Sequence, residues 1–194
     1  MKRKKQTIFF ITLILGLTLF LIQFFDLFLD REELFYAYER GSLCGPSEEI
    51  VYEEEQEDGS VLMIGRQEKA LYMLSAEKVL GIFWKYQGKA YHGYFELPEE
   101  IDGYLLANGQ YIGLCRVPDV TEVEIYFGIW RDRKAENVTL EVKEGGLLYA
   151  DTGLDGMEFS PWYVRGEDET GKTVYERWHH EDLKEQWMKI QQQK

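Results

Sequence analysis

The chain begins with a continuous run of apolar and uncharged residues. The run 7–25 is 19 residues long, and Leu27–Leu29 extend it beyond Asp26. A helix of that length spans about 28 Å, and the hydrocarbon core of a bilayer is about 30 Å thick. In lipid the backbone must satisfy its own hydrogen bonds, so a run of this kind has to be helical. The pattern therefore predicts a transmembrane helix within residues 1–29, preceded by a short basic tail.

The charges on either side of this run differ in sign. Four basic residues precede it and four acidic residues follow it, namely Lys2, Arg3, Lys4 and Lys5, then Asp26, Asp30, Glu32 and Glu33. Basic residues beside a span favour the cytoplasmic side, which predicts a single-pass cell-membrane protein with a cytoplasmic N-terminus and an extracellular C-terminal domain. A cleaved signal peptide has the same basic start, but it needs a shorter apolar core and small residues at its cleavage site. Residues 24–29 contain no small residue, so an uncleaved signal-anchor is the preferred interpretation.

From Ile50 onward the hydrophobic pattern changes to a period of two. In residues 122–127, apolar side chains alternate with polar or aromatic ones, as expected for a strand with one face in a core and one in water. The segments of this kind are rich in residues that favour strands. The predicted strands are 50–54, 61–66, 70–75, 79–86, 90–97, 111–117, 122–130, 135–143, 147–151, 158–166 and 172–177. Turn signals separate them, including a hairpin expected at Gln87-Gly88. Short strands at this spacing predict an all-β antiparallel fold, either a sandwich or a small barrel-like domain.

The predicted domain organisation follows from these patterns. We expect an acidic and aromatic stalk over residues 30–49, broken near Gly41–Ser47, and one extracytoplasmic β-domain over residues 50–178. Residues 179–194 are expected to form a short amphipathic helix, because Leu183, Trp187 and Ile190 recur at i, i+4 and i+7. That apolar stripe would dock on the domain itself or on a partner.

The charge balance excludes one class of partner. The formal net charge is −13 at pH 7, although the first residues are basic. A strongly acidic exported domain repels phosphate backbones, so we expect no nucleic-acid partner. Anionic wall polymers are poor direct ligands for the same reason.

The two cysteines, Cys44 and Cys115, both lie outside the membrane in the predicted topology. Exported compartments permit disulfides, and an even count is compatible with one bridge between them. Such a bridge would contribute about 4 kcal/mol in the chain-entropy model. The alternative is two unrelated thiols, with Cys115 as part of an apolar core.

Several motifs of the β region carry a resemblance. The strand Thr121–Trp130, the alternating strand Ala135–Val142 and the closing hairpin Asp168–Glu176 follow one another, and a Trp-centred stretch lies earlier at Gly81–Lys89. This arrangement resembles a recurrent β-module of small, uncharacterised exported or membrane-anchored proteins of Gram-positive bacilli. The resemblance implies an all-β fold and an extracytoplasmic compartment, and it brings no catalytic residues.

A search for catalytic chemistry finds few signals. The three histidines are His92, within an alternating strand, and the adjacent pair His179-His180 at a predicted helix start. The sequence contains no G-x-S-x-G, no P-loop and no G-x-G-x-x-G motif. Carboxylates are abundant, so pairs at a spacing used by glycosidases arise by chance. We therefore expect no catalytic residues, no cofactor and no metal.

The aromatic residues are the remaining candidates for a binding surface. Those nearest the predicted hairpins are Trp84, Tyr86, Tyr91, Trp130 and Trp162. Exposed aromatic rings stack on sugars or form the centre of a protein interface. The sequence thus favours a non-enzymatic, membrane-tethered extracytoplasmic domain that binds a protein partner or a cell-envelope component. The alternative is an envelope glycan hydrolase or sugar-binding module that uses carboxylates and exposed aromatics.

Overall fold

The fold is mostly antiparallel β-sheet, as the hydrophobic alternation predicts. The structure, a computed structural model, describes residues 2–42, 46–94, 100–129, 134–179 and 184. The chain divides into two compact units, Met1–Glu68 with Tyr72–His92, and Lys69–Leu71 with Gly93–Lys194. The single β-domain expected over residues 50–178 is thus shared between two units, because its buried apolar residues gather in separate clusters.

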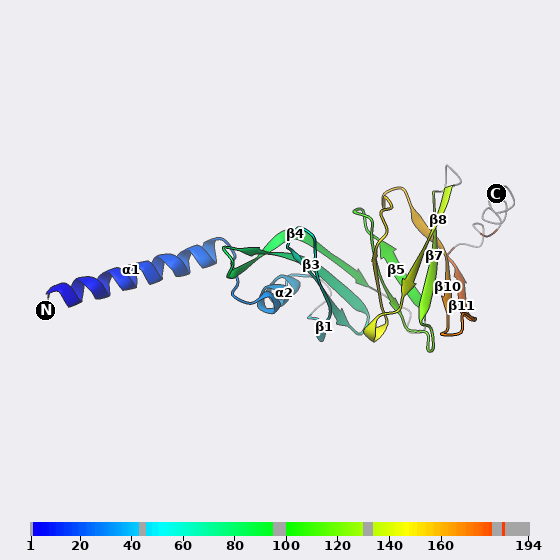
Figure 1. The fold of residues 1–194 in the computed structure, drawn as a ribbon, viewed down its shortest axis with the longest axis horizontal. Coiled ribbons are helices and arrows are strands. Elements are labelled where there is room, and N and C mark those ends of the chain that lie inside the picture. Colours follow the sequence, from blue (N-terminus) through cyan, green and yellow to red (C-terminus); the bar gives the residue numbers. More distant parts are fainter. Residues whose placement is uncertain (1, 43–45, 95–99, 130–133, 180–183, 185–194) are drawn as a thin grey trace. The chain divides into compact units, whose positions relative to one another are not determined.

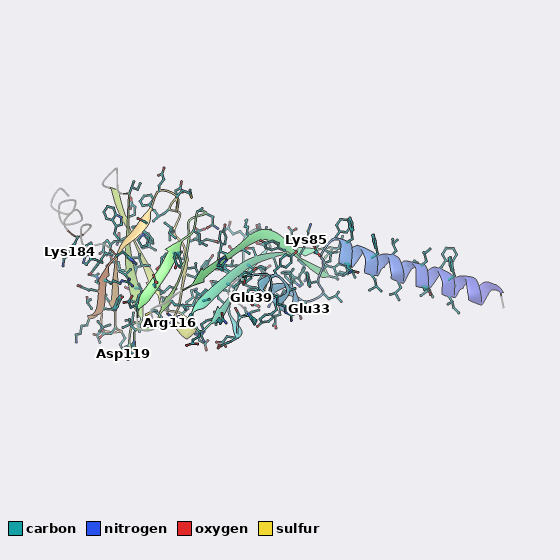
Figure 2. All side chains as sticks on the ribbon, turned by 180° about the vertical axis from the view of Figure 1, so that it is seen from behind. Glu33, Glu39, Lys85, Arg116, Asp119 and Lys184 are labelled. Atoms are coloured by element: carbon teal, nitrogen blue, oxygen red, sulfur yellow. The ribbon has the colours of Figure 1, made fainter. Side chains whose placement is uncertain are left out.

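The first unit begins with the predicted helix. Helix α1 covers Lys2–Phe24, and within the part of the chain that the structure describes it is the one helix long and apolar enough to cross a membrane. Its window Thr7–Phe24 has a mean hydropathy of 2.3 and is 0% buried, and Figure 2 shows its side chains standing clear of the strands. The hydroxyls of Thr12 and Thr18 donate to the carbonyls of Ile8 and Ile14 at 2.9 Å. Both hydroxyl groups are therefore hydrogen-bonded within the helix and are compatible with its apolar surface.

A four-stranded sheet follows, with the order β1-β2-β3-β4 (Figure 1). Its strands are β1 Glu49–Glu55, β2 Val61–Gln67, β3 Ala70–Val79 and β4 Phe83–Tyr94. Helix α2, Arg31–Glu39, packs against this sheet with Leu34 and Phe35 fully buried beside Tyr72 and Leu74. Asp30 caps the helix by accepting a hydrogen bond from the amide of Glu32 at 2.7 Å. The prediction of a stalk over residues 30–49 is therefore wrong, because the helical stripe in this segment completes the core of the first unit.

The hairpin predicted at Gln87-Gly88 is also wrong. Strand β4 continues through these residues without a break, and the chain turns earlier, at Leu80–Ile82. The two central residues of that turn, Leu80 and Gly81, have φ values of 54° and 73°, as the tight turns that suit a hairpin require. Gly88 takes a φ of 79° inside the strand, where its missing Cβ makes this conformation accessible.

The second unit contains two sheets, with the orders β11-β10-β7-β8 and β5-β6-β9. Their strands are β5 Ile101–Leu105, β6 Gln110–Cys115, β7 Glu122–Ile129, β8 Lys134–Glu141, β9 Leu147–Asp151, β10 Ser160–Glu167 and β11 Thr173–Trp178, with a short 3-10 helix η1 at Glu144–Gly146. The two sheets enclose one core, in which Ile101 and Leu148 of one sheet join Ile125 and Val164 of the other. The sequence pattern located all of these strands except β5. The C-terminal helix predicted over residues 179–194 lies almost entirely outside the described residues.

Candidate functional site

One of the five aromatic residues predicted for a binding surface is buried. Trp162, on β10, is 1% exposed and belongs to the interior of the second unit, which corrects its assignment to a binding surface. Its indole occupies the space over Gly128 of β7, where any Cβ would overlap the ring. A buried tryptophan of this kind stabilises the domain through its apolar area, and it is not accessible to a ligand.

Trp84, Tyr86 and Tyr91 lie on β4 of the first unit and are half-buried. The ring of Tyr86 packs against that of Tyr38 with centroids 4.4 Å apart. The Trp84 ring has the guanidinium carbon of Arg31 at 6.0 Å and the ammonium of Lys78 at 5.5 Å from its centroid. Trp84 and Tyr86 thus pack at the edge of the first unit's core. The fifth residue, Trp130, lies outside the described residues.

The predicted disulfide is not formed in this structure. Cys115 carries a free thiol, 7% exposed within the core of the second unit. Its Sγ lies 3.8 Å from the carbonyl oxygen of Val117, and burial raises the pKa of the thiol. Cys44 lies outside the described residues. Cys115 therefore matches the alternative interpretation, a thiol within an apolar core.

A different set of rings forms an aromatic row across the sheet β11-β10-β7-β8. The strand registers place Tyr126 of β7 opposite Tyr163 of β10, and Tyr163 opposite Trp178 of β11. The ring centroids of Tyr126 and Tyr163 are 5.4 Å apart, and those of Tyr163 and Trp178 are 4.5 Å apart. All three side chains are half-buried. They lie at positions that alternate with the core residues Ile125 and Val164, and thus on the opposite face of the sheet from the core.

A row of charged side chains runs beside the aromatic row on the same strands. The registers pair Arg165 of β10 with Glu124 of β7 on one side and Glu176 of β11 on the other. A guanidinium nitrogen of Arg165 lies 2.5 Å from Glu124 and another ion pair of 3.1 Å joins Arg165 to Glu167. Asn137 of β8 donates to the second oxygen of Glu124 at 2.8 Å. We call Glu124, Arg165 and Glu176 the polar row.

Hydrogen bonds tie the two rows together. The phenol of Tyr126 bonds to Glu124, and that of Tyr163 bonds to Glu176. Burial is the largest cause that raises the pKa of Tyr126 to about 12, and the bond to Glu124 and its negative charge raise it further. The pKa of Tyr163 is raised for the same kinds of reason, with Glu176 as the partner. Both phenols are therefore neutral hydrogen-bond donors at physiological pH, and the rings are held in fixed positions.

Sequence reasoning missed this arrangement although its local signal is present. Tyr126 and Tyr163 occupy the outward positions of alternating strands, and Trp178 ends the last strand. The sequence does not state which strands are neighbours, and only the order β11-β10-β7 brings the three rings together.

Acidic side chains also gather at a cavity of about 410 Å³ lined by Asp119, Thr121 and the turn Asp168–Thr170. The carboxylate of Asp168 accepts hydrogen bonds from the hydroxyl of Thr170 at 2.6 Å and from the amides of Thr170 and Lys172 at 2.9 and 3.1 Å, and these bonds lower its pKa. This carboxylate therefore closes the β10–β11 turn. Among the residues that the structure describes, no group of three or more His, Cys, Asp or Glu side chains is placed to hold a metal ion.

Comparisons of the chain with protein-family models, with curated proteins and with solved structures found no match.

Proposed function

We propose that this protein is a non-enzymatic, membrane-tethered binding protein of the extracytoplasmic surface, and that the aromatic row of its second unit binds a neutral glycan of the cell envelope. The observation that carries the proposal is the row itself, in which Tyr126, Tyr163 and Trp178 lie side by side on three neighbouring strands. The fold that presents it is a β-sandwich, and α1 is the tether.

The tether is supported by the length and composition of α1. Its segment Thr7–Phe24 is 0% buried, and an exposed apolar helix of this length is strongly unfavourable in water. Basic residues before it and acidic residues after it favour an external position for everything that follows. A helix retained in the bilayer therefore presents both β units to the cell envelope.

The choice of a glycan is supported by the chemistry of the two rows. Sugar rings present apolar C–H faces that pack on aromatic rings, and hydroxyl edges that hydrogen-bond to carboxylates and guanidinium groups. The aromatic row supplies the first kind of contact and the polar row supplies the second. Because the chain carries a net charge of −13, an uncharged oligosaccharide is favoured over an anionic polymer.

Binding without catalysis is supported by the partners of Glu124. One of its oxygens accepts from Asn137 and the other from Arg165, so neither is directed at a reacting atom. A glycosidase requires a carboxylic acid and a carboxylate that are both free to act on the scissile bond. Glu124 is thus engaged within the sheet, and we therefore propose recognition without catalysis as the role of this surface.

The glycan proposal is tested by binding of the full-length protein, in detergent, to an array of neutral oligosaccharides that includes oligomers of N-acetylglucosamine. Replacing Tyr163→Ala or Trp178→Ala should weaken binding about tenfold, equivalent to about 1.4 kcal/mol. Tyr104→Ala is the matched control, because Tyr104 is 45% exposed on β5 of the other sheet. Equal binding by all three variants would refute the role of the aromatic row. Absence of any oligosaccharide binding, with capture of an envelope protein that depends on Tyr163, would favour the protein-partner alternative.

The tether is tested separately by alkaline extraction of cell membranes. The full-length protein should remain in the membrane fraction, and proteases added to intact cells that lack a wall should digest the β units. Release of an intact β-domain by alkali would show that α1 does not stay in the bilayer.

A further inference from the structure

The turn between β3 and β4 exposes two large apolar side chains. Leu80 is 82% exposed and Ile82 is 60% exposed. Scattered exposed apolar residues are normal on soluble proteins, but two of this size on either side of a single glycine at a hairpin tip form a local apolar projection. We call residues Leu80–Ile82 the hairpin tip.

The backbone of the hairpin tip does not require leucine. Leu80 has a φ of 54°, in the left-handed region where an L-residue with a bulky side chain costs about 1–2 kcal/mol. Asn, Asp or Gly normally occupies such a position in a two-residue hairpin turn. Leucine at position 80 is unfavourable for the backbone of the turn and leaves an apolar side chain in water. Contact of this side chain with an apolar environment would explain why leucine occupies the position.

The hairpin tip lies close to the end of the predicted membrane span. Phe28 forms two backbone hydrogen bonds with Trp84, of 2.9 Å from the amide of Phe28 and 2.7 Å from the amide of Trp84. Phe28 follows α1 by four residues, since α1 ends at Phe24. Ile82 precedes Trp84 by two residues, which is about 7 Å of extended chain. All of these residues belong to the first unit, so this placement does not depend on the second.

The side chains around the hairpin tip are those found at a membrane surface. Trp84 has Arg31 and Lys78 within 6.0 Å of its ring centroid, and tryptophan and long basic side chains are enriched where headgroups meet acyl chains. Leu29, next to the bonded Phe28, is 69% exposed and is a further exposed apolar side chain near the end of α1. The acidic residues Asp26 and Asp30 also lie in this segment, and they favour contact with lipid that is not anionic.

We propose that the hairpin tip inserts into the outer leaflet of the same bilayer that α1 spans. This inference rests on the tether in the proposed function. The insertion provides a second contact with lipid beside the helix, and it holds the first unit against the membrane surface. Its ligand is the acyl-chain boundary of the bilayer, recognised through Leu80, Ile82 and Leu29.

The test measures how deeply the hairpin tip lies in lipid. The full-length protein carries a spin label at Ile82→Cys in a Cys44→Ser background, and it is reconstituted in vesicles of phosphatidylcholine. Cys115 is buried in the second unit's core, so it does not compete for the label. The label at residue 82 should collide several-fold more with oxygen, which concentrates in the bilayer, than with a water-soluble nickel chelate. The matched control is Met157→Cys, because Met157 is as exposed as Leu80, at 82%, and should favour the chelate.

The outcomes separate this inference from the proposed function. Flotation of the labelled protein with the vesicles tests the tether. Flotation together with equal collision ratios at residues 82 and 157 would overturn the insertion and leave the tether intact. Failure to float would overturn both. A second measurement on Leu80→Asn, labelled at residue 82, should lower the oxygen preference, because one of the inserting side chains is lost.

Discussion

The clearest residue-scale consequence concerns the proton of Tyr126. Burial, with Glu124 as the second cause, raises its pKa from 10.0 to about 12. A folded-state pKa above the unfolded value stabilises the fold below the unfolded pKa, and this contribution is lost as the pH rises through the folded pKa. We therefore expect the free energy of unfolding to fall between pH 10 and pH 12, and the replacement Tyr126→Phe to make that fall shallower. Chemical denaturation over this pH range measures the slope.

The same series contains its own control. Below pH 10 Tyr126 is neutral in both folded and unfolded chains, so the difference in stability between Tyr126→Phe and the original protein should not vary with pH there. Parallel curves above pH 10 would contradict the assigned environment of Tyr126.

Neighbouring residues show where sequence prediction succeeds and fails at this scale. Trp162 and Tyr163 are adjacent on β10, and the first side chain is buried while the second is half-buried. The local pattern does not say which of the two faces the core. Trp162 is buried with its indole against Gly128, and that contact joins residues far apart in the sequence. The sequence therefore predicted an aromatic surface but assigned it partly to the wrong side chains.

At the scale of the element, the β3–β4 turn gives a prediction that separates stability from membrane contact. Replacing Leu80→Asn places a residue that tolerates the left-handed region at a φ of 54°. We expect the free energy of unfolding to rise by about 1 kcal/mol, measured by chemical denaturation in detergent. Ile82→Asn is the matched control, because Ile82 lies in the same turn without a positive φ, and it should give no such gain.

A gain from Ile82→Asn as large as that from Leu80→Asn would attribute the effect to surface polarity and contradict the role of backbone strain. The lipid contact should respond differently, because both replacements remove an exposed apolar side chain from the hairpin tip. If Leu80 served only the structure of the turn, the more stable variant Leu80→Asn would keep its contact with lipid.

The elements that the sequence located best are those whose signal is local. Strand β7 alternates over most of its length, β9 is a short apolar run, and the predicted limits of both agree with the structure within one residue. Gln87-Gly88 is an equally local turn signal, yet β4 passes through it as a neighbour of β3 in the sheet. The sequence predicts a stalk in place of helix α2 because the two buried apolar residues of the helix, Leu34 and Phe35, have their packing partners in the sheet, far along the chain.

At the scale of the whole molecule, the chain length suggested one exported domain, and the structure divides the strands between two units. Length and periodicity carry no information about which apolar residues share a core. The cluster around Phe35 and the cluster around Phe127 have no residue in common. Each unit therefore contains a buried apolar cluster of its own.

This separation predicts how core damage spreads. Phe35 and Phe127 are each fully buried, one in each unit, and replacing a buried phenylalanine by alanine costs about 3–5 kcal/mol. Phe35→Ala should speed hydrogen exchange at the amides of β2 and β3 and leave those of β7 and β10 protected, whereas Phe127→Ala should do the reverse. Exchange followed by mass spectrometry on the full-length protein reads both sets of strands in one experiment. If either variant speeds hydrogen exchange equally in both sets of strands, the two cores unfold together. The two units would then be separate in packing but would form one cooperative unit in unfolding.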